Sequence, residues 1–166
     1  MIAEVSANTI AAARHAARLA AVQALYQMEL TNGDAEEVAR EFIEHRFGGD
    51  TGPASEPDEE FFSAILNGVP QHQVEIDRSV ARCLSSDWKL ERIDSILRAI
   101  LRAASFEFIG RKDVPAKVVI DEYVEISHAF FSDGEPAFVN AVLDRLAHRK
   151  RAPEFGETPP DDELQF

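Results

Sequence analysis

One glutamate and one histidine in this sequence have the spacing of a metal-binding pair. Glu125 and His128 form a Glu-x-x-His motif. Di-iron helical bundles use this motif in two copies, together with two further glutamates that face inward. The chain contains the motif once, in a stretch whose other polar residues are expected at the surface. We therefore expect no metal site.

Cys83 is the only cysteine, which excludes an internal disulfide and a multi-cysteine zinc or iron–sulfur site. We expect it to be a packed core residue. The glycines at 48, 49 and 52 lie in an acidic stretch without the lysine that a phosphate-binding loop needs. Because no pattern pairs carboxylates in an apolar pocket, we expect neither a cofactor nor enzymatic activity.

The sequence contains better candidates for binding than for catalysis, namely a group of cations near the N-terminus. Arg14, His15 and Arg18 have the three- and four-residue spacing of one helical face. They lie within residues 5–28, which contain no acid. The alternative interpretation is the solvated face of an ordinary helix, and charge alone favours that alternative.

Two further features could contribute to binding. Arg98 and Arg102 are one turn apart and are expected on the outside of a strong amphipathic helix. Phe138 follows Pro136 at the expected start of the last helix, where an aromatic ring could be core or a stacking platform. Periodicity alone favours the core.

The charge of the chain is concentrated in two segments. The formal net charge is −13, which by itself argues against nucleic acid as a partner. Residues 34–60 hold ten acids against two bases, and residues 152–166 hold five acids and no base. The rest of the chain is therefore neutral overall, and a local neutral-to-basic face is compatible with the composition.

Apolar spacing predicts helices throughout and no strand. The expected helices are 11–30, one that starts at Asp34, 58–84 with a kink or break at Pro70, 90–110, 113–131, and one that starts near 132–136 and ends in the basic run 148–151. The fold class is thus all-α with about seven helices. The predicted core includes Leu25, Phe62, Ile96, Leu97, Ile100, Leu101, Phe108, Val139 and Leu143.

Length and composition define the organisation outside these helices. We expect a flexible extension over 1–10, a helical domain over 11–151, a loop over 48–57 and a disordered acidic tail over 152–166. No apolar run reaches the roughly 18 residues of a membrane span. The first ten residues carry Glu4 and no base, unlike a secretory signal. These features predict a cytoplasmic protein.

Four segments together resemble a known family. Residues 18–27 (RLAAVQALYQ) resemble the opening helix of the bacterial NusB family of transcription antitermination factors. Residues 92–107, which end in ILRAASFE, 112–125 (KDVPAKVVIDEYVE) and 138–146 (FVNAVLDRL) resemble later motifs of that family. The order is the same across about residues 11–149.

The resemblance implies two packed three-helix-like halves, about 11–84 and 88–151. It implies binding of boxA-type single-stranded RNA together with NusE, a small-ribosomal-subunit protein. It also implies entry into an antitermination complex on RNA polymerase, notably on ribosomal RNA operons. The same domain is fused to RNA cytosine methyltransferases, but the chain is expected to be too short for that catalytic domain.

By matching position, the resemblance assigns RNA contacts to Arg14, His15, Arg18, Arg102 and Phe138. The arginine-rich N-terminus of the family is reduced here to these first three cations. A helical protein–protein scaffold without RNA binding is the alternative function, and homodimerisation of the free chain is left open.

Overall fold

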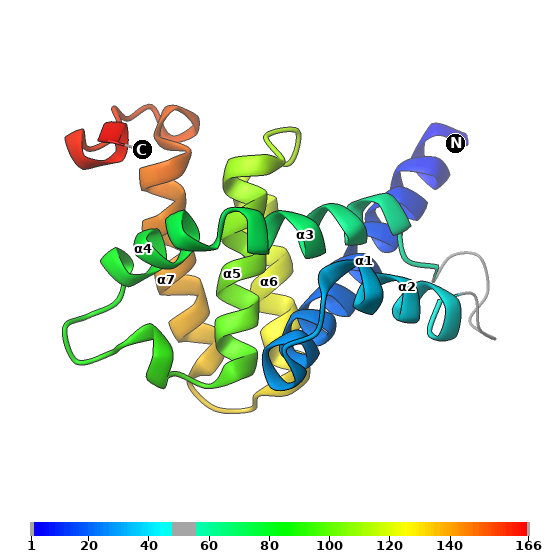
Figure 1. The fold of residues 1–166 in the computed structure, drawn as a ribbon. Helices are drawn as coiled ribbons and strands as arrows, with labels where there is room; N and C mark the ends of the chain where they lie inside the picture. Colours follow the sequence, from blue (N-terminus) through cyan, green and yellow to red (C-terminus); the bar gives the residue numbers. More distant parts are fainter. Residues whose placement is uncertain (1, 48–55, 166) are drawn as a thin grey trace. The chain divides into compact units, whose positions relative to one another are not determined.

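The computed structural model describes residues 2–47 and 56–165, and within these ranges the chain is all-helical. It contains seven α-helices, three short 3-10 helices and no strand in the described part (Figure 1). This confirms the all-α prediction. Most of the expected loop over 48–57 lies outside the described residues.

The chain divides into two compact units, Met1–Pro70 and Gln71–Phe166. The expected halves placed the division later, between about 84 and 88. It falls earlier because the expected 58–84 helix is two helices, α3 (Glu59–Gln71) and α4 (Gln73–Cys83), with His72 between them. Pro70 lies in the last turn of α3, where it removes a backbone donor.

The first unit contains α1 (Ile2–Thr31), α2 (Ala35–His45) and most of α3. Residues 2–10, expected to be a flexible extension, are the first turns of α1, because this stretch has neither glycine nor proline. The helix ends where Asn32 takes a left-handed backbone conformation (φ 54°). Asp34, the predicted start of the next helix, caps α2 by accepting from the Glu36 and Glu37 amides.

The core of the first unit is aromatic. Phe42 of α2 stacks on Phe62 of α3 with ring centroids 5.7 Å apart, and Phe47 meets Phe62 edge-on at 5.0 Å. The start of α3 is tied to α1 by a 3.0 Å hydrogen bond from the Asp58 amide to the Ala13 carbonyl. Together these contacts hold α2 and α3 against the buried alanine-rich face of α1.

The second unit is built around α5 (Ser95–Gly110), which packs against α4, α6 (Ala116–Phe130) and α7 (Glu135–Lys150). Figure 1 shows α5, α6 and α7 side by side. The expected helix over 90–110 begins only at Ser95, capped by Asp94, and Leu90–Arg92 form a separate 3-10 turn, η2.

Arg98 does not lie on the outside of α5, as the sequence predicted, but is 8% exposed. Its guanidinium donates to the carbonyls of Leu90 and Ile93, at 3.0 and 2.9 Å. The side chain therefore fastens η2 to α5, and burial is tolerated because its donors are satisfied within the protein.

The predicted core is confirmed at every position except Ile96. That residue is only partly buried, because it lies in the first turn of α5, at the edge of the core. The buried members are Leu25, Phe62, Leu97, Ile100, Leu101, Phe108, Val139 and Leu143.

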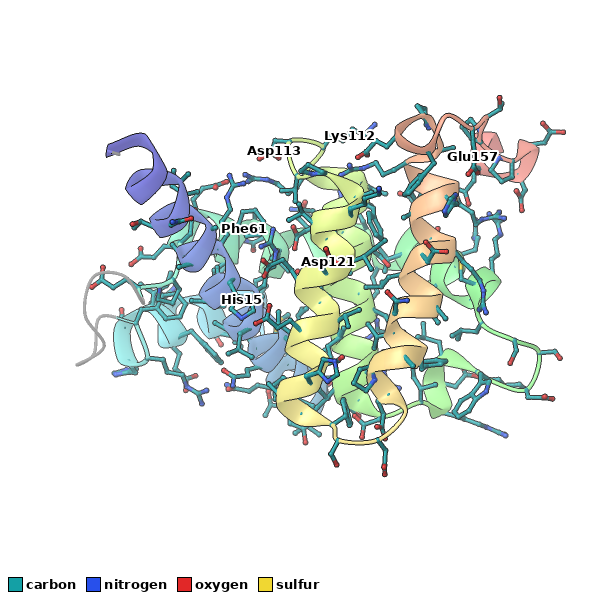
Figure 2. All side chains as sticks on the ribbon, turned by 180° about the vertical axis from the view of Figure 1, so that it is seen from behind. His15, Phe61, Lys112, Asp113, Asp121 and Glu157 are labelled. Carbon is teal, nitrogen blue, oxygen red and sulfur yellow. The ribbon has the colours of Figure 1, made fainter. Side chains whose placement is uncertain are left out.

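Residues 152–165 are not disordered in the structure, contrary to the prediction from composition. They form two 3-10 helices, η3 (Ala152–Phe155) and η4 (Asp161–Gln165), after α7. Figure 2 shows Glu157 in this segment, where its carboxylate lies 2.7 Å from His148 Nδ1. The acidic residues are held by cations of the helix that precedes them. In the described part of the chain, no helix is long and apolar enough to cross a membrane.

Candidate nucleic-acid interface

The two arginines of α1 lie against one aromatic ring. The guanidinium carbons of Arg14 and Arg18 each lie 4.8 Å from the centroid of Phe61, the third residue of α3. This distance is within the range of cation–π attraction. Figure 2 labels His15 and Phe61 in this unit. The ring therefore fixes the direction of both arginines.

These three cations differ in exposure. Arg18 is 2% exposed, whereas Arg14 and His15 are partly exposed. Their helix carries no acid from residue 5 to residue 28. Arg14 and His15 are thus placed to meet an anion from solvent, and Arg18 is placed to support the ring beneath Arg14.

Arg102 of α5 is held by a carboxylate of α4. Its Nε lies 2.9 Å from Asp77 Oδ1, and one terminal nitrogen lies 3.0 Å from Asp77 Oδ2. The two side chains are 16% and 30% exposed. This two-pronged pair orients the guanidinium at the surface, and a phosphate there has to compete with Asp77.

Phe138 is neither a core residue nor fully exposed. It lies in the first turns of α7, and its ring centroid is 5.6 Å from that of Trp88. Trp88 is 54% exposed, in the segment before η2. Sequence analysis missed Trp88. The signal that could have found it is a lone tryptophan next to the polar turn Ser85–Ser86–Asp87.

The five candidate residues fall in different units. Arg14, His15 and Arg18 belong to Met1–Pro70, and Arg102 and Phe138 belong to Gln71–Phe166. Within the first unit the structure brings the arginines together around Phe61, and within the second it places Arg102 on α5 and Phe138 on α7. The candidates of the first unit therefore lie together, whereas Arg102 and Phe138 contact different neighbours, Asp77 and Trp88.

The basic run at the end of α7 is paired with the acidic tail. Arg149 meets Asp162 at 2.6 Å and Glu163 at 2.7 Å, and Lys150 meets Glu163 at 2.8 Å. Burial alone would raise the pKa of the Glu163 carboxyl. The hydrogen bonds from Lys150 and Arg149 outweigh it and hold that pKa below its usual value. In this state the run is engaged within the chain.

Arg151, the last cation of the run, is buried and fastens three segments together. It donates to the carbonyls of Glu107, Phe108, Arg111 and Val114 and to the Glu154 carboxylate. Glu154 also accepts the Ala116 amide at the start of α6, at 3.0 Å. Burial alone would raise the Glu154 pKa, but these bonds from Ala116 and Arg151 lower it.

The candidates for metal or thiol chemistry, Glu125, His128 and Cys83, do not form a metal site in the described part of the chain. Glu125 and His128 are both exposed on α6. Among the residues that the structure describes, no group of three metal-ligating side chains is close enough to hold an ion. Cys83 is buried, as predicted, and burial raises the pKa of its thiol.

Comparison with known proteins shows which family the chain belongs to. The model of the NusB family matches residues 15–148. The chain belongs to the NusB family. Transcription antitermination protein NusB of Maricaulis maris is 51% identical over 144 residues, which are 86% of this chain and 90% of the relative. That of Caulobacter vibrioides is 48% identical over 140 residues, covering 83% and 94%.

Solved NusB structures share the fold. The T. maritima NusB structure has a TM-score of 0.70 and 28% identity, and the match covers 92% of this chain and 97% of that one. A complex of the antitermination factors NusB and NusE with double-stranded RNA contains a chain with a TM-score of 0.67 at 24% identity. That match covers 80% and 94% of the two chains. The matched NusB family region ends at residue 148, so the whole acidic tail, residues 152–166, lies outside it.

Proposed function

We propose that this chain is an RNA-binding transcription antitermination factor. With NusE it binds boxA-type single-stranded RNA of nascent transcripts, notably of ribosomal RNA operons, and promotes processive transcription by RNA polymerase. The observation that carries this proposal is the identity of about half, over most of both chains, to relatives named transcription antitermination protein. The role is one of binding, without a catalytic step.

The exposure of each candidate residue in the structure refines the RNA contacts proposed from the sequence. Arg14 and His15 are partly exposed on an acid-free helix and suit phosphate contacts. Arg102 suits a phosphate contact that competes with its pairing to Asp77, and Phe138 offers a partly exposed ring to a base. Arg18, buried against Phe61, serves as a positioning residue for Arg14.

The charge of the chain supports a requirement for NusE. A few phosphate contacts on a chain of net charge −13 give weak binding that falls with salt. A partner that adds its own contacts to the same RNA raises the affinity through effective concentration. The basic run of α7 adds little in this state, because the tail engages it.

The test is fluorescence anisotropy of labelled boxA-type RNA and of a scrambled RNA of equal composition, with and without NusE. We expect tight, sequence-selective binding only when both proteins are present. Equal binding of the two RNAs, or no gain from this chain over NusE alone, would favour the protein–protein scaffold instead.

A further inference from the structure

Three cations from two helices of the second unit converge on the end of the acidic tail. Arg149 of α7 binds the carboxylates of Asp162 and Glu163, and Lys150 also binds Glu163. Nitrogens of Arg82, on α4, lie 4.0 Å from Asp162 and 3.9 Å from Glu163. The tail thus supplies two neighbouring carboxylates to a basic cluster of the helical body, formed by Arg82, Arg149 and Lys150.

A pocket of about 390 Å³ opens beside this basic cluster, at the end of the unit where Figure 2 shows Lys112 and Glu157. This volume is within the usual range of ligand sites. The tail forms one wall of the pocket through Pro159 and Glu163. The ionisable lining residues of the helical body are His72, Glu75, Lys112, Arg149 and Lys150. Among the described lining residues, three permanent cations would face one acid, Glu75, if the tail wall were removed.

The tail is attached differently along its length. Its first part, η3, is anchored by apolar packing, because Ala152 is fully buried and the Phe155 ring stacks on His148 with centroids 4.0 Å apart. Its last part, η4, is attached through the ion pairs of Asp162 and Glu163. Ion pairs at a protein surface are weakened by salt, and their cations can exchange one anion for another. A competing anion can therefore displace η4 while η3 stays in place.

We propose that this pocket is a binding site for the phosphates of RNA, and that η4 occupies its cations as an internal competitor that RNA displaces. The proposal rests on the proposed RNA-binding function. Arginine binds carboxylates and phosphates with the same two-pronged geometry. Asp162 and Glu163 thus stand where two phosphate oxygens of a bound RNA would lie.

The lining favours an RNA backbone over an RNA base. The one phenylalanine among the described lining residues, Phe108, is fully buried, so it offers no face on which a base could stack. Lys112, Arg149 and Lys150 instead offer charge, which phosphate contacts use without regard to sequence. We therefore expect binding at this pocket to be insensitive to RNA sequence.

The salt dependence of RNA binding tests this competition. In wild type, the carboxylates that RNA displaces take up the counterions that the RNA releases. In Asp162→Asn/Glu163→Gln this compensation is lost, so the slope of log affinity against log salt should steepen by about 1.4, or about 0.7 for each contact at Arg149 and Lys150. Binding at low salt should tighten at least about threefold, on the scale of one or two exposed ion pairs. Anisotropy of a labelled oligouridine without NusE measures both quantities.

The matched control is Asp121→Asn/Glu125→Gln, which makes the same chemical changes at two exposed acids of α6. It should keep the wild-type slope. Adding Arg149→Gln to Asp162→Asn/Glu163→Gln should remove about half of the gain in slope, because one of two phosphate contacts is lost. An unchanged slope in Asp162→Asn/Glu163→Gln, or an equal gain in the control, would overturn the proposal. Melting temperatures show whether each variant is folded.

Hydrogen–deuterium exchange of the wild-type chain tests the displacement without any substitution. A saturating concentration of oligouridine at low salt should speed the exchange of amides in residues 158–165 and leave residues 152–157 unchanged. Slower or unchanged exchange in residues 158–165 at every oligouridine concentration would overturn the proposal. If poly-glutamate speeds this exchange and oligouridine does not, the pocket takes an acidic protein segment, and the proposal is likewise overturned.

These results are distinguishable from a failure of the proposed function, because they are measured without NusE and with an RNA that lacks the boxA sequence. If boxA-type RNA is selected with NusE but oligouridine leaves the tail in place, the pocket assignment fails and the function stands. If oligouridine displaces the tail but boxA-type RNA binds no better than scrambled RNA, the pocket stands and the function fails.

Discussion

Arg102 is held by Asp77, and a phosphate that bound the guanidinium would have to displace this carboxylate. Replacing Asp77 with asparagine removes the negative charge that holds the guanidinium at 2.9 and 3.0 Å and so weakens this competition. We expect boxA-type RNA to bind about two- to fivefold more tightly in the presence of NusE. This gain is on the scale of one partly exposed charge interaction.

The control for Asp77→Asn is Asp121→Asn, which makes the same change of net charge at an exposed position on α6. Figure 2 labels Asp121. An equal gain in both variants would assign the effect to the overall charge. No gain in Asp77→Asn, in a protein with an unchanged melting temperature, would remove Arg102 from the interface.

The variant Phe138→Ala tests whether this ring stacks on RNA or packs in the core. The ring is partly exposed, so Phe138→Ala should leave the melting temperature nearly unchanged and weaken RNA binding by about 1–3 kcal/mol. The salt dependence should not change, because no phosphate contact is lost. Phe108→Ala, at a fully buried ring of α5, should instead cost about 3–5 kcal/mol of stability. A large loss of stability in Phe138→Ala would identify its ring as core.

At the scale of single residues, the sequence predicts which residues are buried or cap a helix better than it predicts the partners of a side chain. The apolar stripe and the Asp34 cap follow from local spacing, so they were predictable. The spacing predicts Arg98 on the outside of its helix, but its burial depends on the carbonyls of Leu90 in η2 and of Ile93 directly after it. Ile96 fits the stripe but lies in the first turn of its helix, where the core ends.

At the scale of elements, Arg151, the residue directly after α7, is a buried cation that joins several segments of the second unit. The Arg151 guanidinium donates to four backbone carbonyls between Glu107 and Val114. Lysine has a single ammonium and cannot reach them all. Arg151→Lys should lower the free energy of unfolding by at least about 2 kcal/mol, because buried carbonyls lose their donor.

Urea denaturation followed by circular dichroism measures this loss. Arg92→Lys, at an exposed arginine of η2, is the matched control and should change stability by less than about 0.5 kcal/mol. Equal stability of the two variants would show that Arg151 is not a structural fastener.

The acidic tail should stabilise the second unit in a pH-dependent way. The Glu163 side chain is 5% exposed between Arg149 and Lys150, and Glu163→Gln should cost about 1–2 kcal/mol because one acceptor remains. Asp161→Asn, at an exposed acid of η4, should cost almost nothing. Thermal melts at neutral pH compare the two.

The pH dependence has a definite direction. Because the pKa of the folded Glu163 lies below its usual value, its contribution is fully present above the ordinary pKa of glutamate, about 4.3. It is lost as pH falls through the lower folded-state pKa. The gap between wild type and Glu163→Gln should therefore close in acid. A gap that stays constant to low pH would contradict the ion-pair account.

The ordered structure of the acidic tail could not be predicted from its composition. The segment has many acids, prolines and few apolar residues, a pattern typical of disorder. Its order comes instead from the basic run 148–151, whose four cations all find partners in residues 154–163. The basic run and the acidic tail are adjacent in sequence. They form ion pairs because the folded end of α7 directs the basic side chains toward the acidic ones.

At the scale of the whole molecule, the question is whether RNA senses the total charge or individual cations. The net charge is −13, and Arg14→Gln and Arg40→Gln each lower it by one further unit. Arg14 lies on the acid-free part of α1, whereas Arg40 is exposed on the acidic α2. The variants are therefore equal in total charge and different in local field.

If Arg14 contacts a phosphate, only its loss changes the number of counterions released on binding. For single strands, the slope of log affinity against log salt is about 0.7 per phosphate contact. We expect Arg14→Gln to reduce this slope by about 0.7 for boxA-type and scrambled RNA alike, and Arg40→Gln to leave it unchanged. Anisotropy titrations with NusE over a series of salt concentrations measure the slopes. Equal slopes in both variants and wild type would mean that the acid-free face of α1 does not meet RNA. The proposed RNA contacts would then be confined to Arg102 and Phe138.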